Sequence, residues 1–156
     1  MRVRVIAVGQ RLPAWIETGC EEYVKRMPRE WNFDLVSLKG VTRVEGKPAA
    51  EAMRAEAKQI EAAIPDGFWR IALDERGKQA TTAELAGYLR AWRQDGRDVA
   101  LIIGGADGLD PALKEGAQQV LALSALTLPH GLARLLLVEQ LYRASSLLQG
   151  HPYHRV

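Results

Sequence analysis

The segment Leu101–Gly131 constrains the fold more than any other part of this 156-residue chain. It contains two apolar runs, and each run breaks into a loop, the first at Gly104-Gly105 and the second at Pro129. We interpret the two runs as parallel strands that open into loops at their carboxyl ends. Open α/β sheets bind their ligands outside the carboxyl ends of the strands. The segment therefore predicts one side of a ligand crevice.

Apolar runs of strand length alternate with helical patterns along the rest of the chain. The strands are expected at residues 2–9, 33–38, 68–73, 98–103 and 119–123, and the last helix at 132–148. Phe33–Leu38 is nearly continuous in apolar residues, so we expect it to be buried on both faces. Thr81 and Glu84 have the spacing of a capping box that opens a helix.

Every connection between the expected strands is long enough for a crossover between parallel strands. We therefore predict an α/β fold with a mostly parallel five-stranded sheet flanked by helices. A length of 156 residues is sufficient for one substantial core, so a single domain over residues 1–156 is expected.

Composition narrows the class of protein but not its function. The chain has 47% hydrophobic and 26% charged residues, which is ordinary for a soluble globular protein. A net charge of +2 permits nucleic-acid binding without arguing for it, because dedicated binders concentrate more basic charge. The single cysteine, Cys20, fits a reducing cytosol. Because we see neither a secretory signal nor an uninterrupted spanning run, we expect a cytoplasmic protein without a membrane partner.

The glycines at Gly104, Gly105 and Gly108 follow a strand and let backbone approach a ligand closely. They match neither the dinucleotide fingerprint nor a phosphate-binding Walker loop. A tight turn that needs glycine only for its geometry is an equally good interpretation of these residues alone. The second loop, Leu123–Leu128, is small and apolar and has no lysine or arginine to neutralise a phosphate. It therefore favours a flat, uncharged ring, and S-adenosylmethionine over NAD or ATP.

Other candidate chemistries are weaker. His151 and His154 are three residues apart, but no cysteine or carboxylate cluster completes a metal site, so we expect no metal. Cys20 lies on an apolar helical stripe and is interpreted as an inert buried thiol. Glu139 and Arg143 have the i,i+4 spacing of an ordinary surface ion pair on a helix.

The polar C-terminus, Gly150–Val156, has two interpretations. A frayed end is the general expectation for a terminus. However, Tyr153 can stack on a base, Arg155 can hold a phosphate, and His154 titrates near neutral pH. We favour a functional role for this tail.

Several motifs follow one another along the whole chain. They are Leu73-Asp74 with Gly77-Lys78, Ile103-Gly104-Gly105-x-x-Gly108-Leu109, Ser124-x-Leu126-Thr127-x-Pro129-His130, Glu139-Gln140-x-Tyr142-Arg143-Ala144 and His151-Pro152-Tyr153-His154-Arg155. Together they resemble the SPOUT class of α/β-knot RNA methyltransferases, although each motif alone is a weak signal. This resemblance implies a homodimeric enzyme that uses S-adenosylmethionine, without a metal, and has no DNA or membrane partner. The implied substrate is N3 of a pseudouridine in a hairpin loop of 23S rRNA, within the assembled ribosome.

The resemblance also implies a C-terminal trefoil knot, which pattern alone would not propose because true knots are nearly absent from proteins. Carried over by position, the implied contacts to S-adenosylmethionine are Leu73, Gly104, Leu123, Ser124, Ala125, Leu126, Thr127 and Leu128. The implied catalytic and RNA-facing residues are Arg143, Tyr153, His154 and Arg155.

Our hypothesis is that His154 orients or deprotonates the base, while Arg143 and Arg155 hold a phosphate or a developing oxyanion. Ser145 departs from the family pattern, in which we expect a larger residue. Two alternatives remain open: a non-catalytic, flavodoxin-like adenine-nucleotide-binding module, and an RNA-binding adaptor with a vestigial pocket.

Overall fold

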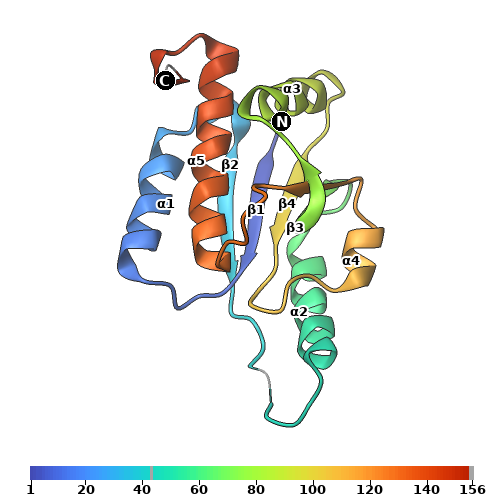
Figure 1. Cartoon of the computed structure of the whole chain (residues 1–156). Helices are drawn as coiled ribbons and strands as arrows, with labels where there is room; N and C mark the ends of the chain where they lie inside the picture. Colours follow the sequence, from blue (N-terminus) through green and yellow to red (C-terminus); the bar gives the residue numbers. More distant parts are fainter. Residues whose placement is uncertain (43, 155–156) are drawn as a thin grey trace.

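Five strands form one sheet in the order β2-β1-β4-β3-β5, and every pair of neighbours is parallel. This computed structural model describes residues 1–42 and 44–154 (Figure 1). The strands are β1 (Val3–Val8), β2 (Phe33–Leu38), β3 (Trp69–Gln79), β4 (Val99–Ile103) and β5 (Gln119–Ala122). The helices are α1 (Ala14–Arg26), α2 (Ala49–Ala63), α3 (Thr82–Gln94), α4 (Pro111–Glu115) and α5 (His130–Gln149), with short 3-10 turns at Arg29–Trp31 and Pro152–His154. The predicted α/β fold with a five-stranded parallel sheet is confirmed.

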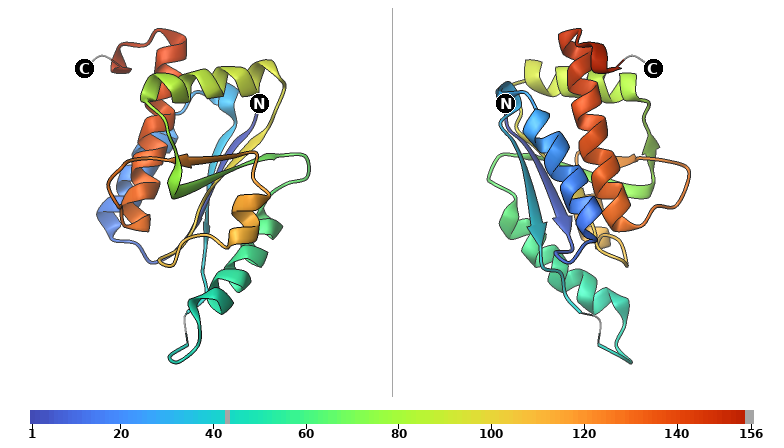
Figure 2. Two further views of the ribbon diagram at one scale, coloured as in Figure 1. Left: turned by 45° about the vertical axis from the view of Figure 1, so that its right-hand side comes forward. Right: turned by 90° about the vertical axis from the view of Figure 1, so that its left-hand side faces the viewer.

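Helices cover both faces of the sheet, as the two views of Figure 2 show for α1 and α5 on one side and α2 on the other. The core on the α3 and α5 side includes Trp31, Ile71, Leu89, Leu101, Leu137 and Leu141. The core on the α2 and α4 side includes Ile6, Ile60, Ile102 and Leu113. The central strand β4 is buried along its whole length, which accounts for its unbroken apolar sequence. Within the described part of the chain, no helix is long and apolar enough to cross a bilayer.

The prediction that Phe33–Leu38 is buried on both faces is wrong. This segment is β2, an edge strand that pairs only with β1; five of its six residues are partly buried, and Ser37 is exposed. Phe33 and Leu35 pack against one core and Val36 and Leu38 against the other. An edge strand is covered from one flank only, so apolar residues on both faces reach only partial burial.

The third strand is longer than predicted, because β3 continues beyond the expected end at Leu73 as far as Gln79. Its pairing with β5 shifts register between Leu73 and Lys78, as in a β-bulge. Gly77 makes this possible, since a Cβ at this position would lie 2.6 Å from the backbone of Leu121. The bulge carries the chain past the end of β5 to the start of α3.

The helix termini follow the local sequence. Thr81 Oγ1 accepts from the amide of Glu84 at 3.1 Å, and the Glu84 carboxylate accepts from the amide of Thr81 at 2.7 Å. The predicted capping box is therefore confirmed. Asp110 caps α4 with its side chain alone, which accepts from the amide of Ala112 at 2.9 Å. Gly150 ends α5 in the left-handed conformation that glycine favours, with a φ of 68°.

Arg134 anchors α5 to the sheet. Its guanidinium donates to the carbonyl oxygens of Val8 at 3.3 Å and Gly9 at 2.8 Å, and to Ser37 Oγ at 3.1 Å. The residue is only 3% exposed, and this burial lowers the pKa of Arg134 from its usual value. The three bonds hold the first turns of α5 against the carboxyl ends of β1 and β2.

We expect Arg134→Met to lower the free energy of unfolding by about 2 to 3 kcal/mol, because the buried carbonyl oxygen of Val8 and the partly buried one of Gly9 lose a charged donor. Urea denaturation measures this change. The control is Arg90→Met at an exposed position of α3, which should be nearly neutral. Equal effects of the two substitutions would contradict the anchoring role of Arg134.

Candidate active site

A cavity of about 230 Å³ opens where β3 and β5 end, between the start of α3 and the middle of α5. The sheet and the two helices supply its wall: Leu73, Ala80, Thr81, Thr82, Leu85, Leu101, Leu121, Ala122, Leu123, Leu136, Leu137 and Gln140. This is the position at which an open α/β sheet is expected to hold a ligand. Of the segment predicted to form the crevice, Leu101 and the residues 121–123 line this cavity, and β3, not β5, is the neighbour of β4.

The wall of this cavity is uncharged among the residues that the structure describes. Thr81, Thr82 and Gln140 are its polar members. Thr82 Oγ1 donates to Gln140 Oε1 at 2.7 Å, whereas Thr81 Oγ1 is used in the capping box. Apolar walls with a few fixed polar groups are typical of small-molecule sites. This wall can enclose a neutral ring but offers no cation for a phosphate.

The sequence-predicted cofactor residues fall into two groups. Leu73 and Leu123 line the cavity. Gly104 and the loop 124–128 lie outside this wall, and Leu126 in the loop is 74% exposed. Two contacts shape the loop: Ser124 Oγ accepts from the amide of Leu126 at 2.9 Å, and Thr127 Oγ1 donates to Glu75 at 3.3 Å.

Gly104 has a structural role in the turn after β4. A Cβ at Gly104 would lie 2.6 Å from the carbonyl carbon of Gly108, so only glycine fits there. Gly108 has a φ of 85°, in the left-handed region that also favours glycine. These contacts show that the turn requires glycine for its own geometry. The assignment of Gly104 to the cofactor remains a prediction.

The sequence did not predict three residues of the cavity wall: Thr82, Leu136 and Gln140. Leu136 and Gln140 are four residues apart on α5, so they lie on the same helical face. Thr82 is the first residue of α3, directly after the recognised cap. Two sequence features could have indicated these wall residues. Gln140 is a polar residue on an otherwise apolar face of α5, and α3 begins directly after the end of β3.

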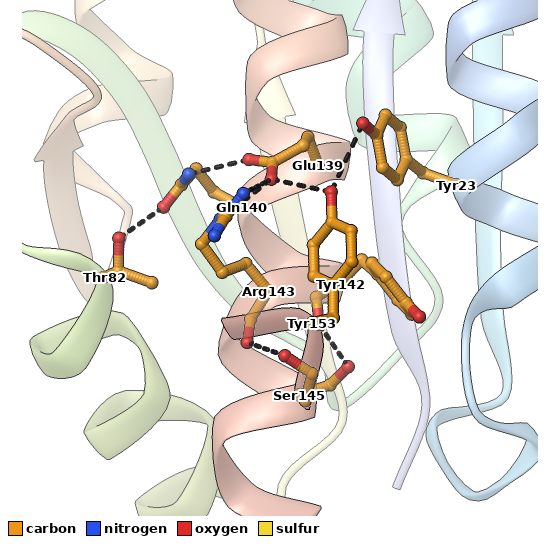
Figure 3. A network of polar contacts seen from close by, with 9 residues as sticks. Tyr23, Thr82, Glu139, Gln140, Tyr142, Arg143, Ser145 and Tyr153 are labelled. Carbon is orange, nitrogen blue, oxygen red and sulfur yellow. Dashed lines mark hydrogen bonds and ion pairs between the residues drawn. The ribbon is translucent and has the colours of Figure 1, made fainter. Parts of the chain in front are cut away.

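A second cluster of polar side chains joins α5 to the C-terminal turn (Figure 3). Glu139 Oε1 accepts from Arg143 Nε at 2.9 Å and from the hydroxyl of Tyr153 at 3.1 Å. The Arg143 guanidinium lies over the ring of Tyr153, 4.8 Å from its centroid. The rings of Tyr142 and Tyr153 are 4.5 Å apart, and the hydroxyls of Tyr23 and Tyr153 are 3.3 Å apart. The structure thus brings together two of the predicted catalytic residues, Arg143 and Tyr153.

The tail does not fray directly after α5. Pro152–His154 form a 3-10 turn that packs on α5, and Tyr153 is partly buried there. The amide of Tyr153 donates to Nδ1 of His151 at 3.2 Å. The side chain of His154 and all of Arg155, both predicted catalytic residues, lie outside the described residues.

Tyr153 is held as a neutral phenol. Burial, the hydrogen bond with Tyr23 and the nearby Glu139 carboxylate together raise the pKa of Tyr153 far above its usual value. A phenol in this state donates a hydrogen bond and does not accept a proton. Tyr153 is therefore suited to orient or stack on a substrate base, and not to deprotonate it.

Cys20 and Ser145 are both buried on helices beside the cluster. The predicted burial of Cys20 is confirmed, and this burial raises the pKa of its thiol. The Ser145 hydroxyl donates to the carbonyl oxygen of Tyr142 at 2.7 Å. Ser145 also borders a gap of about 10 Å³ beside Trp31, so its small size leaves only a minor packing defect. Among the described residues, no group of three His, Cys, Asp or Glu side chains is placed to hold a metal ion.

Known proteins resemble this chain over nearly its full length. A family model described as a predicted SPOUT methyltransferase matches residues 1–154. A protein of Methylibium petroleiphilum named ribosomal RNA large subunit methyltransferase H is 56% identical over 155 residues, which is 99% of each chain. A protein of the same name from Ralstonia nicotianae is 56% identical over 156 residues, which is 100% of each chain.

A solved structure shares the fold. It is that of a probable methyltransferase from Bordetella pertussis Tohama I, and it matches with a TM-score of 0.59 at 22% identity. The match covers 92% of this chain and 95% of that chain. The uncharged cavity at the ends of β3 and β5 agrees with the function of these relatives as methyltransferases. The family model and the relatives above 50% identity show that this chain belongs to the SPOUT methyltransferase family.

Proposed function

We propose that this protein transfers a methyl group from S-adenosylmethionine to N3 of a pseudouridine in a hairpin loop of 23S rRNA, within the assembled ribosome. The observation that carries the proposal is the uncharged cavity beside the cluster of Arg143 and Tyr153, in a chain of this family. The relatives' name, ribosomal RNA large subunit methyltransferase H, supports an rRNA substrate.

S-adenosylmethionine fits the cavity by its chemistry. Leu73 and Leu123 offer apolar surface for an adenine ring, and Thr82 and Gln140 offer polar groups for its edges. Gly104 and the adjoining loop, Ser124, Ala125, Leu126, Thr127 and Leu128, complete the proposed contacts. When it is bound, this group supplies an electrophilic methyl on a sulfonium.

The residues near the tail would act on the RNA. As N3 forms its bond to the methyl carbon, the carbon–sulfur bond breaks and the N3 proton passes to a base. We assign His154 to orient the uracil ring or take this proton. Arg143 and Arg155 would hold a phosphate or the developing oxyanion, and Tyr153 would position the ring. Positioning supplies much of the rate in such a transfer.

A homodimer explains the surface of α1 and α5. Apolar residues surround α5 on nearly all sides, which is typical of a buried helix. Yet Leu132 and Leu135 are only partly buried, and Trp15 of the adjacent α1 is 62% exposed. A second copy of the chain on this face would bury all three residues. We propose that the protein works as this dimer in the cytoplasm, where ribosomes are found.

The family fold includes a trefoil knot, and we propose that the C-terminal segment of this single domain is threaded in this way. In support, β5 lies at the far edge of the sheet beside β3, yet the next helix, α5, returns across the sheet to pack against α1. The loop after β4 contains Gly104, and the loop after β5 contains the predicted cofactor residues 123–128. Such a knot would close the cavity around its ligand.

The ligand can be tested by calorimetry with S-adenosylmethionine, NAD and ATP. We expect S-adenosylmethionine to bind at least about tenfold more tightly than the other two, because the cavity wall has no cation for their phosphates. Leu136→Trp should fill the cavity and abolish binding, while Val44→Trp, at an exposed position, should not. Equal binding of all three ligands would instead indicate a nucleotide-binding module.

The role of His154 can be tested with ribosomes that carry the unmethylated pseudouridine. We expect His154→Ala to reduce turnover by roughly 100-fold or more, as is usual for the loss of a general base, without a change in S-adenosylmethionine affinity. The matched control is His151→Asn, which keeps a side-chain acceptor for the amide of Tyr153. Full turnover by His154→Ala would remove His154 from the mechanism.

A further inference from the structure

Glu139 is the one carboxylate in the cluster that Figure 3 shows, and its two oxygens bind different partners. Oε1 accepts from Arg143 Nε and lies 2.9 Å from an Arg143 Nη, and it also accepts from the Tyr153 hydroxyl at 3.1 Å. Oε2 accepts from Gln140 Nε2 at 2.7 Å. The side chain is 17% exposed, so these partners take the place of most of its water. Glu139 is therefore held from two sides.

The same contacts reach the wall of the cavity. Gln140, which donates to Glu139, accepts in turn from Thr82 Oγ1 at 2.7 Å, and both Gln140 and Thr82 line the cavity. A continuous chain of hydrogen bonds thus runs from the proposed cofactor site through Glu139 to Arg143 and Tyr153. The residues in this chain of hydrogen bonds belong to α3, α5 and the C-terminal turn.

The chemistry of the donors fixes the direction of these bonds. A carboxylate only accepts, so the Tyr153 hydroxyl donates to Glu139 at 3.1 Å, and it shares this proton with the Tyr23 hydroxyl oxygen at 3.3 Å. Arg143 uses Nε and one Nη toward Glu139, and its other Nη has no hydrogen bond within residues 1–42 and 44–154. Glu139 therefore orients the guanidinium while leaving donors for a substrate oxygen.

We propose that Glu139 is a positioning residue for the methyl transfer, which holds Arg143 and Tyr153 at a set place relative to the cofactor cavity. This inference rests on the proposed function, because it assigns Arg143 and Tyr153 to the RNA side of that reaction. Glu139 acts through these two residues and does not contact the reacting atoms. A displacement of catalytic groups by even 1 Å lowers rates by orders of magnitude, so loss of the link should affect turnover more than binding.

The first test is Glu139→Gln, which preserves the size of the side chain and removes its charge. We expect kcat on unmethylated ribosomes to fall by about tenfold or more. The affinity for S-adenosylmethionine should stay within about twofold, because the cavity wall is intact. The KM for ribosomes should not rise, because the loss of one negative charge favours RNA binding. The matched control is Glu61→Gln, which breaks an ion pair with Arg70 of 2.7 Å on the other face of the sheet and should leave kcat unchanged.

A double-mutant cycle separates positioning from general support of the fold. If Glu139 acts through Tyr153, Glu139→Gln combined with Tyr153→Phe should lose less than the product of the two single losses. If Glu139→Gln does not fold, Glu139→Asp provides a second variant. The Asp side chain retains the charge but is one carbon–carbon bond shorter, which withdraws its oxygens by about 1.5 Å. We expect it to lose kcat as well.

Three results would overturn the inference while the proposed function stands: wild-type kcat in Glu139→Gln, wild-type kcat in Glu139→Asp, or a double variant whose loss equals the product. A wild-type protein that transfers no methyl group to ribosomes would instead overturn the proposed function. The two failures are thus distinguishable in one set of assays.

Discussion

The close approach of β5 to Gly77 determines the architecture around the cavity. The backbone of Leu121 lies 2.6 Å from the place that a Cβ of residue 77 would occupy, so any other residue would displace β5 from the sheet. The shifted register lets Lys78 and Gln79 pair with Leu121 and Ala122. As a result β3 extends beyond the other strands and delivers the chain to the start of α3. Leu121 and Ala122, which pair with this extension of β3, both line the cavity.

Helix α5 connects the two halves of the proposed site. Arg134 fixes the start of the helix to β1 and β2, one turn before Leu136 and Leu137 reach the cavity. Further along the helix, Glu139 accepts a hydrogen bond from the tail residue Tyr153, and Gln140 accepts one from Thr82 in the cavity wall. A rigid helix that carries both contacts holds the cofactor side and the RNA side of the site in one frame.

Features governed by short-range patterns were predictable from the sequence. Apolar periodicity indicated the five strands, and Thr81 and Glu84 indicated the start of α3; the structure confirms both. The edge position of β2 and the extension of β3 were not predictable, because strand order and the packing of Gly77 depend on residues far away in the sequence.

The candidate site was predictable only in part, and mostly through the family resemblance. Leu73 and Leu123 were identified in this way and do line the cavity. Thr82 and Gln140 were missed, since polar residues on a helix are normally assigned to the solvent-facing side. Glu139 and Arg143 were recognised as an i,i+4 pair, which the structure confirms at 2.9 Å. Only the fold shows that Tyr153 contacts this pair. The chain turns back onto α5 through the short 3-10 turn Pro152–His154, and no periodic sequence pattern indicates such a turn.

The most direct test of the proposed activity is to map the methyl group that the protein transfers. Ribosomes lacking this modification and the isolated 23S rRNA hairpin, both with the pseudouridine present, would each be incubated with the protein and S-adenosylmethionine and analysed by mass spectrometry of RNA fragments. We expect one methyl group on N3 of the pseudouridine in ribosomes, and a rate at least about 100-fold lower on the hairpin, because a protein with a net charge of only +2 attracts naked RNA weakly. Methylation of the hairpin as fast as the ribosome, or of another nucleotide, would contradict this account.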